Sequence, residues 1–245
     1  MIHDNGQRRM IFLRSLALTL ALIVITPPYS LIALASFPLP AQTRWRIISG
    51  WARIMLWLSK VLTGISYRVE GLEHLPKEPA IILSKHQSAW ETIAFQIIFP
   101  PQVQVLKREL LWIPFFGWGL ALMSPIAINR SRGSGALKRM AARGAQRIAQ
   151  GFWILIFPEG TRISPGKRSK YHVGGAWVAC RLGTPVVPVA HNAGLYWGKN
   201  EFMKRPGEIR VQIGEPIYPA GLKPEALNTK VEEWIEARMA ALCPA

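Results

Sequence analysis

The sequence predicts an α/β protein in which helices flank a mixed, largely parallel sheet, with a membrane-associated helical segment at the N-terminus. From residue 65 onward, short apolar runs alternate with stretches of helical periodicity, as in α/β domains. Residues 15–37 are apolar, carry no charge, and are about long enough to cross the hydrocarbon core of a membrane as a helix. We therefore divide the chain into membrane-anchoring helices over residues 1–64 and a domain over residues 65–245.

The composition limits the classes of function. Thirty Lys and Arg against fourteen Asp and Glu give a net charge of +16, and half of the 245 residues are hydrophobic, which excludes a disordered chain. Strong positive charge indicates nucleic acid or an anionic membrane as a partner, and the long apolar segments beside it favour the membrane. Two cysteines exclude a disulfide scaffold, and the five histidines lack metal-binding spacings, so no metal site is expected.

The apolar stretch over residues 15–37 has three interpretations. Pro27 and Pro28 interrupt it, and proline inside a helix kinks or breaks it, so we favour a monotopic hairpin bent at these two residues. The alternatives are a single membrane span and a signal peptide cleaved near residues 33–35. Basic residues on both flanks favour both ends lying on one side of the membrane.

A second, amphipathic helix is predicted over residues 44–64, where apolar residues recur at helical spacing opposite a row of basic ones. Trp45, Trp51 and Trp57 are expected at the level of the lipid headgroups. We favour an interfacial helix, and the alternative is an ordinary helix packed on the domain. Both hold if one edge packs on the domain and the other contacts lipid.

Within the domain, short apolar runs predict six strands and helical periodicity predicts four helices. The strands are expected at Ala80–Ser84, Val103–Leu106, Pro125–Ile128, Trp153–Phe157, Val186–Ala190 and Glu208–Ile213. The helices are expected at Ser88–Ile98, Ser134–Gln150, Val173–Leu182 and Pro224–Leu242.

Polar residues follow successive strands at the point where each strand ends. In chain order they are Lys85 and His86, then Lys107, then Asn129 and Arg130, then Glu159 and Arg162, and finally His191. Ligands of open α/β sheets bind outside the carboxyl ends of the strands. If these strands are parallel, the residues meet at one edge of the sheet and form a binding site.

His86 and Glu91 are the candidate catalytic pair. On one helix a separation of five residues is about 140° around the axis, so they meet only if His86 precedes the helix and Glu91 lies in its first turn. Ser88 supports this boundary, because Ser88 and Glu91 have the spacing of a capping box. A neutral imidazole oriented by a carboxylate is a competent general base. The alternative is that Glu91 only caps the helix and His86 is an ordinary loop residue.

Two further groups of residues are candidate ligands. Arg130 suits a phosphate because a guanidinium binds phosphate bidentately, and Lys107 can add a point charge. After the predicted strand 153–157, Gly160 permits a tight backbone approach, and Glu159 and Arg162 place opposite charges in one turn. The alternative for this segment is a surface turn with a local ion pair.

Taken together, these residues resemble the glycerolipid acyltransferases, a family whose best-known members are 1-acyl-sn-glycerol-3-phosphate (lysophosphatidate) acyltransferases. The resemblance covers roughly residues 65–215 and rests on blocks in the family's order. His86-x4-Glu91 resembles the His-x4-Asp block, with Glu91 one methylene longer than the usual Asp. Residues 128–130 resemble the block ending in a phosphate-binding arginine, and Phe157–Arg162 matches the FPEGTR block. Residues 107–117 and 187–189 resemble two further blocks.

The resemblance implies the glycerolipid acyltransferase fold and transfer of a fatty acyl group from acyl-CoA or acyl carrier protein to 1-acyl-glycerol-3-phosphate, giving phosphatidic acid. It implies His86 as the general base with Glu91 as its partner, and, as substrate-binding residues, Lys107, Arg130, Glu159, Gly160, Thr161 and Arg162. It implies no metal and no cofactor besides the acyl donor as co-substrate. The expected partners are membrane lipids, lysophosphatidic acid and the donor, not nucleic acid. The expected location is a bacterial-type inner membrane, with the site on the cytoplasmic face.

Two other functions remain open at this point. The chain could be an acyltransferase of the same family that acts on another lysolipid acceptor. It could also be a non-catalytic membrane lipid-binding protein, which would bind lipid without cleaving a thioester. A nucleic-acid-binding protein would have no need for the apolar segment over residues 15–37.

Overall fold

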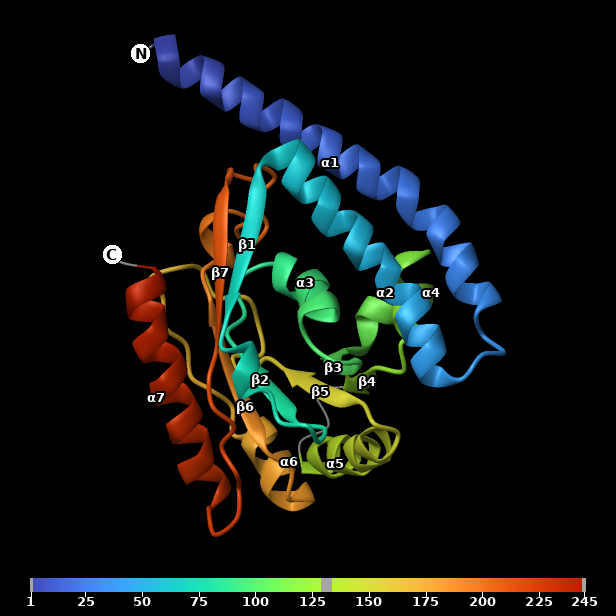
Figure 1. Cartoon of the computed structure of the whole chain (residues 1–245), viewed down its shortest axis with the longest axis vertical. Helices are drawn as coiled ribbons and strands as arrows, with labels where there is room; N and C mark the ends of the chain where they lie inside the picture. The colour runs from blue at the N-terminus through green and yellow to red at the C-terminus, as the bar shows by residue number, and fades with distance from the viewer. Residues whose placement is uncertain (1, 129–133, 244–245) are drawn as a thin grey trace.

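The computed structural model describes residues 2–128 and 134–243, and this part of the chain contains one seven-stranded sheet (Figure 1). Along the sheet the strands lie in the order β1-β7-β6-β2-β5-β3-β4. In chain order they are β1 (Ile65–Glu70), β2 (Ile81–Ser84), β3 (Gln102–Lys107), β4 (Ile126–Ile128), β5 (Trp153–Ile156), β6 (Val186–His191) and β7 (Gly207–Ile213).

The five strands β6, β2, β5, β3 and β4 are parallel, which confirms the predicted largely parallel sheet. Their carboxyl ends therefore meet at one edge. Strand β7 runs antiparallel to β6 and pairs in parallel with β1, so these two strands make the sheet mixed. Strand β1 is not among the strands predicted from the sequence, because it lies partly exposed at the sheet edge and lacks a continuous apolar run.

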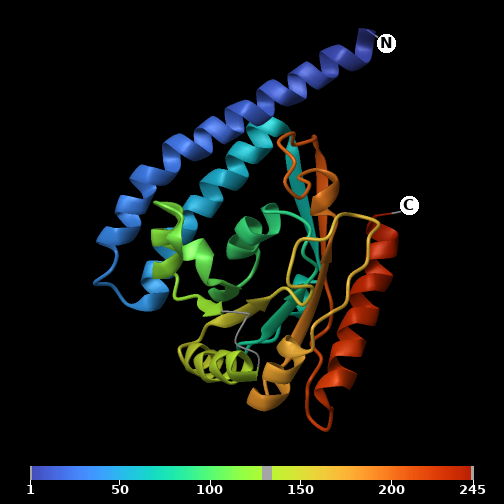
Figure 2. The same cartoon turned by 180° about the vertical axis from the view of Figure 1, so that it is seen from behind.

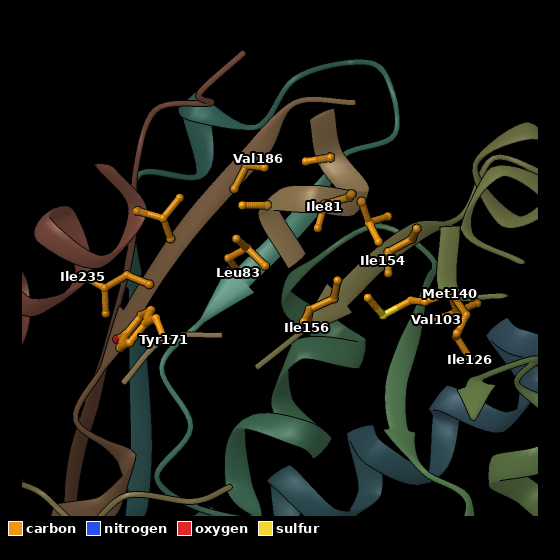
Figure 3. Packing of buried hydrophobic residues seen from close by; sticks show 14 of the residues in the cluster. Ile81, Leu83, Val103, Ile126, Met140, Ile154, Ile156, Tyr171, Val186 and Ile235 are labelled. Carbon is orange, nitrogen blue, oxygen red and sulfur yellow. The ribbon is translucent and has the colours of Figure 1, made fainter. Parts of the chain in front are cut away.

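Helices cover both faces of the sheet, which is why its central strands consist of apolar residues up to Ser84 and His191 at the carboxyl ends of β2 and β6. Every residue of β2, β5 and β6 is buried. On one face, Ile81 and Leu83 pack with α5 (Ser134–Ala149), α6 (Gly174–Leu182) and α7 (Pro224–Leu242), as Figure 3 shows around these strands. On the other face, Ile82 packs with α2 (Ala41–Leu58) and α3 (Trp90–Ile98). This two-sided burial is typical of parallel strands.

The N-terminal segment differs from the favoured interpretation. Helix α1 (Ile2–Ala35) continues through Pro27 and Pro28, so the hairpin bent at these prolines is wrong. The chain turns at residues 36–40, and α2 returns beside α1 across one end of the molecule (Figures 1 and 2). Contacts just beyond the prolines hold α1 in place. The Tyr29 hydroxyl donates to Ile47 O at 2.6 Å, and Ser30 Oγ donates to Phe115 O at 3.0 Å, at the start of α4 (Phe116–Leu122).

Helix α1 is a candidate membrane span. Among the described residues, one helix, over Asn5–Ala35, is long and apolar enough to cross a membrane. By length and composition alone this is weak evidence for membrane association.

Helix α2 is buried against the rest of the protein to a greater extent than the predicted interfacial helix would be. Trp45 is only 4% exposed and its Nε1–H donates to Gln102 O at 2.7 Å, while Trp51 is buried and donates to Thr26 Oγ1 at 3.2 Å. The expectation that these two tryptophans lie at the lipid headgroups is therefore wrong, because indole N–H groups find partners inside the protein. Trp57, on the same helix, is 61% exposed, and its contact with lipid stays a prediction.

The orientation of α2 can be tested with matched tryptophan variants. Trp45→Phe removes the donor to Gln102 O and leaves a buried carbonyl unpaired, which we expect to cost about 1–3 kcal/mol and to lower Tm by several degrees. Trp57→Phe makes the same change at an exposed position and should leave Tm unchanged. Thermal unfolding in one detergent measures both. An unchanged Tm for Trp45→Phe would contradict this orientation.

Candidate active site

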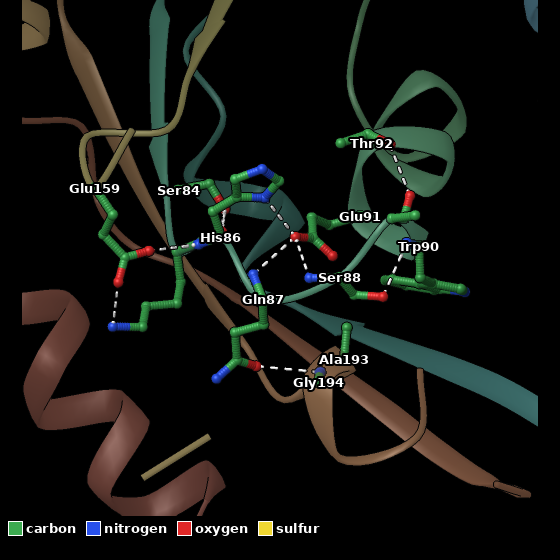
Figure 4. Close-up of polar contacts among 12 residues, drawn as sticks. Ser84, His86, Gln87, Ser88, Trp90, Glu91, Thr92, Glu159, Ala193 and Gly194 are labelled. Carbon is green, nitrogen blue, oxygen red and sulfur yellow. Dashed lines mark hydrogen bonds and ion pairs between the residues drawn. The ribbon is translucent and has the colours of Figure 1, made fainter. Parts of the chain in front are cut away.

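The predicted pair of His86 and Glu91 is in direct contact (Figure 4). His86 lies in the connection after β2 and Glu91 in the first turn of α3, and Nδ1 of His86 is 2.8 Å from Glu91 Oε1. The same oxygen accepts the backbone N–H groups of Gln87 at 2.9 Å and Ser88 at 2.8 Å. Ser88 Oγ in turn accepts the N–H of Trp90 at 3.0 Å. The predicted arrangement of a loop histidine and a first-turn carboxylate is confirmed.

These contacts determine which nitrogen of the His86 ring donates a hydrogen bond and which can act as a base. Burial of Glu91 by itself raises the pKa of its carboxyl, but the influence of His191 and His86 and the hydrogen bonds from His86 and Ser88 outweigh burial and lower the pKa. An ionised Glu91 only accepts hydrogen bonds, so Nδ1 of His86 is the donor. Nε2 is then the ring nitrogen with a free lone pair when His86 is neutral. Phe157 stacks on the imidazole at 4.0 Å and limits its rotation.

His191, at the end of β6, is fully buried beside this pair. Its Nε2 donates to Lys85 O at 2.9 Å, and its Nδ1 accepts the N–H of Ala193 at 3.3 Å. Burial lowers the pKa of His191, so its imidazole is neutral at pH 7. Both ring nitrogens are used in holding the backbone, which assigns His191 a structural place in the site.

Glu159 contacts the backbone of His86. Its Oε2 accepts the backbone N–H of His86 at 2.9 Å, and its Oε1 is 2.6 Å from Lys85 Nζ (Figure 4). Burial raises the pKa of this carboxyl, and the hydrogen bond and charge of Lys85 oppose the rise. The N–H of Ile163 donates to His86 O at 2.7 Å, so the segment over residues 159–163 brackets the backbone of His86 on both sides.

This arrangement contradicts the alternative of a surface turn with a local ion pair. The ion-pair partner of Glu159 is Lys85, and Glu159 is buried. Gly160 has a φ of 70°, the left-handed conformation that glycine adopts without strain, and this turns the chain after Glu159. Thr161 is exposed and Arg162 is half-buried, so these two residues lie on the open side of the segment.

The structure describes only one of the two candidate phosphate ligands. Lys107 is the last residue of β3, at the same edge of the sheet as His86, and it is exposed. Because β5 separates β3 from β2, the two strands lie about 10 Å apart. Arg130, like Asn129, lies outside the described residues.

A group of contacts close to His86 and Glu91 was not predicted from the sequence. Lys85 Nζ lies 2.7 Å from Glu236 Oε1 of α7, and the Tyr171 hydroxyl donates to the same oxygen at 2.9 Å. The one local signal was a lysine directly after an apolar strand. Nothing near Glu236 in the sequence indicates its partner, because 151 residues separate it from Lys85.

The structure provides no indication of a metal centre. Within residues 2–128 and 134–243, no group of three or more His, Cys, Asp or Glu residues could hold a metal ion. The expectation that the chain needs no metal or organic cofactor stays a prediction.

Comparison with known proteins adds independent information. A model of the acyltransferase family matches residues 66–192. The 1-acyl-sn-glycerol-3-phosphate acyltransferase of Pseudomonas aeruginosa is 49% identical over 210 residues, which cover 84% of this chain and 82% of that protein. The 1-acyl-sn-glycerol-3-phosphate acyltransferase alpha of Mus musculus is 29% identical over 177 residues, covering 71% of this chain and 62% of that protein. The chain thus spans less than two thirds of the length of this mammalian relative.

A solved structure shows the same fold. The crystal structure of the 1-acyl-sn-glycerophosphate (LPA) acyltransferase PlsC from Thermotoga maritima matches with a TM-score of 0.80. The match covers 98% of each chain at 22% sequence identity. This similarity extends to the N-terminal helices and confirms the predicted fold.

The neutral state of His191 predicts how stability depends on pH. Because the pKa of folded His191 lies below 6.5, the unfolded chain takes up a proton below this pH that the folded chain does not. Stability should therefore fall as the pH decreases from above 6.5 to about 5. His191→Gln should flatten this part of the Tm profile, whereas His172→Gln, at an exposed histidine, should not. Equal slopes in the wild-type protein and His191→Gln would show that His191 does not contribute.

Proposed function

The chain belongs to the acyltransferase family, and we infer that it is a 1-acylglycerol-3-phosphate acyltransferase. The relative from Pseudomonas aeruginosa, similar over most of both chains, supports the acceptor, lysophosphatidic acid. The observation that carries the chemistry is the contact between His86 Nδ1 and Glu91 Oε1, because it leaves the other ring nitrogen available as a base.

We propose direct acyl transfer with His86 as the general base. Nε2 of His86 removes the proton from the free glycerol hydroxyl while the hydroxyl oxygen attacks the thioester carbonyl. The new C–O ester bond forms, the C–S bond breaks, and the proton passes from His86 to the thiolate that leaves. Glu91 orients the imidazole and stabilises the imidazolium that forms in between, as a carboxylate does in other His–carboxylate pairs.

The substrate phosphate needs cations at the same edge of the sheet. We propose that Lys107 and Arg130 hold the phosphate, since guanidinium and ammonium groups are the usual partners of phosphate oxygens. Thr161 and Arg162, on the open side of their segment, would shape the acceptor site together with Gly160. Glu159 contributes to that site from behind, because its carboxylate is bound to Lys85 and to the backbone of His86.

The acyl donor is a thioester of either coenzyme A or acyl carrier protein. Both present the same reacting carbonyl to His86, so one assay with two donors distinguishes them. The enzyme needs no metal or organic cofactor in this mechanism, because His86 accepts and returns the proton and the thioester supplies the leaving thiolate.

We propose that the protein works on a membrane, because both lysophosphatidate and its product are lipids. A second apolar surface accompanies α1, and we call it the aromatic segment (residues 108–118). It begins at Arg108, immediately after Lys107, and runs into α4, which packs on α1. Its large exposed apolar side chains are Leu110, Trp112, Ile113, Phe115, Phe116 and Trp118.

This segment suits the interface of an anionic bilayer. Aromatic side chains are favoured at the headgroup level, and basic residues beside them are attracted to anionic lipid. The bond from Ser30 Oγ to Phe115 O joins the segment to α1, so the two apolar surfaces enter a membrane together. The basic residues on both sides of the apolar stretch over residues 15–37 support the cytoplasmic face of a bacterial-type inner membrane as the location.

The catalytic role of His86 predicts a large loss of activity in one variant. His86→Ala should lower kcat by about 10²–10⁴-fold while the protein stays folded, because it removes the proposed base. The assay follows thiol release from acyl-CoA or from acyl carrier protein in mixed micelles with lysophosphatidate. His172→Ala, at an exposed histidine, is the matched control and should keep wild-type activity. Undiminished activity in folded His86→Ala would remove His86 from the mechanism.

The aromatic segment predicts a change in membrane binding. Trp112→Ala combined with Trp118→Ala should reduce binding to vesicles that contain anionic phosphatidylglycerol, since two exposed apolar anchors are lost. Co-sedimentation of the purified protein measures the bound fraction. Leu72→Ala, an exposed apolar residue far along the chain from this segment, should bind as the wild type does. Equal binding of all three proteins would show that the segment stays in water.

A further inference from the structure

Lys85 is an unusual residue to find in the interior. It stands directly before His86 at the end of β2, yet it is 1% exposed. A buried ammonium is tolerated only when it is paired and hydrogen-bonded. Its Nζ meets this condition with two carboxylates, Glu159 Oε1 at 2.6 Å and Glu236 Oε1 at 2.7 Å. The ring of Tyr171 covers it, with the centroid 5.6 Å from Nζ.

Glu236 is also largely buried and hydrogen-bonded. It comes from α7, where Ile235 and Met239 belong to the buried face, and its side chain is only 12% exposed. Its Oε1 accepts from Lys85 and from the Tyr171 hydroxyl, and its Oε2 lies 3.4 Å from Arg168 Nε. Burial and the neighbouring carboxylates raise the pKa of Tyr171, so its hydroxyl remains a donor. The positive charges of Lys85 and Arg168 balance the negative charges of Glu159 and Glu236.

These contacts form a chain that ends at the proposed base. Glu236 holds Lys85, Lys85 holds one oxygen of Glu159, and the other oxygen of Glu159 accepts the backbone N–H of His86 at 2.9 Å. The two oxygens of a carboxylate move as one rigid group. A change in the place of Lys85 therefore changes the direction in which Glu159 holds His86. Glu236 itself has no contact with the His86 ring among the contacts of the described residues.

We propose that Glu236 is a positioning residue of the active site: through Lys85 and Glu159 it fixes the backbone of His86, so that Nε2 meets the acceptor hydroxyl. The C-terminal helix α7 is thereby part of the catalytic apparatus. The proposal rests on the proposed function in so far as His86 is the base. Small errors in the placement of a reacting group lower kcat strongly while they leave substrate binding intact.

The kinetic test compares two glutamates of α7. Glu236→Gln keeps the size of the side chain but removes its charge, and it should lower kcat by about tenfold or more, with KM for lysophosphatidate and donor unchanged. Glu236→Asp, which keeps the carboxylate, should recover part of this loss. Glu233→Gln makes the same change at an exposed position of α7 for which no ion pair is found within the described ranges, and it should behave as the wild type.

A second readout does not depend on turnover. Amide hydrogen exchange resolved to the amide of His86, within the peptide over residues 84–88, reports the bond from His86 N–H to Glu159, and in Glu236→Gln this exchange should become about tenfold faster. In Glu233→Gln it should not change. If Glu236→Gln does not fold, Tyr171→Phe, which removes only the hydroxyl donor to Glu236, should show smaller changes of the same kind in both readouts.

The outcomes separate the two proposals. Wild-type kcat and wild-type exchange in folded Glu236→Gln would overturn the positioning role. A loss of activity that matches a loss of folded protein, with unchanged exchange at residues 84–88, would also overturn it. If the wild-type protein does not acylate lysophosphatidate, the proposed function fails, and the exchange experiment still decides whether Glu236 holds the backbone of His86.

Discussion

The structure of the site depends on one buried carboxylate oxygen, Glu91 Oε1. Glu91 is completely buried, so its charge has to be met by hydrogen bonds from the protein. Three donors meet it, namely His86 Nδ1 and the backbone N–H groups of Gln87 and Ser88. To supply them, the chain after β2 must curl around the first turn of α3. The same curl turns Nε2 of His86 away from Glu91 and leaves the His86 side chain 16% exposed.

The parallel sheet makes this arrangement possible. Five strands end at one edge, and the residues that follow them are forced into contact although they are far apart in the chain. Lys85 and Glu159, which follow β2 and β5, carry charge although they are buried. The site contains them because Lys85 is paired with Glu159 and Glu236, which offsets the loss of water, as the three hydrogen bonds to Oε1 do for Glu91. His191 contributes in the neutral state and so adds no charge to be compensated.

The substrate of such an enzyme has an apolar chain and a charged head, and the molecule offers a surface for each. Helix α1 and the aromatic segment expose apolar side chains, whereas the parallel strand ends carry the polar chemistry. Helix α2 lies between the two parts, with buried Trp45 bonded to the start of β3 and Trp51 bonded to α1. It therefore fixes the distance between the apolar surface and the reacting groups.

The sequence by itself determined what depends on local pattern. Strands β2, β5 and β6 were predictable because burial on both faces leaves a continuous apolar run, and the contact of His86 with Glu91 was predictable because helix capping acts over a few residues. The tertiary structure decided what depends on docking. It showed that Pro27 and Pro28 stay within α1, where contacts to α2 and α4 hold the helix, and that Trp45 faces inward. It also brought Lys85 into contact with Glu236. Only the packing of α7 on the sheet joins these two residues, because the sequence around either one gives no indication of the other.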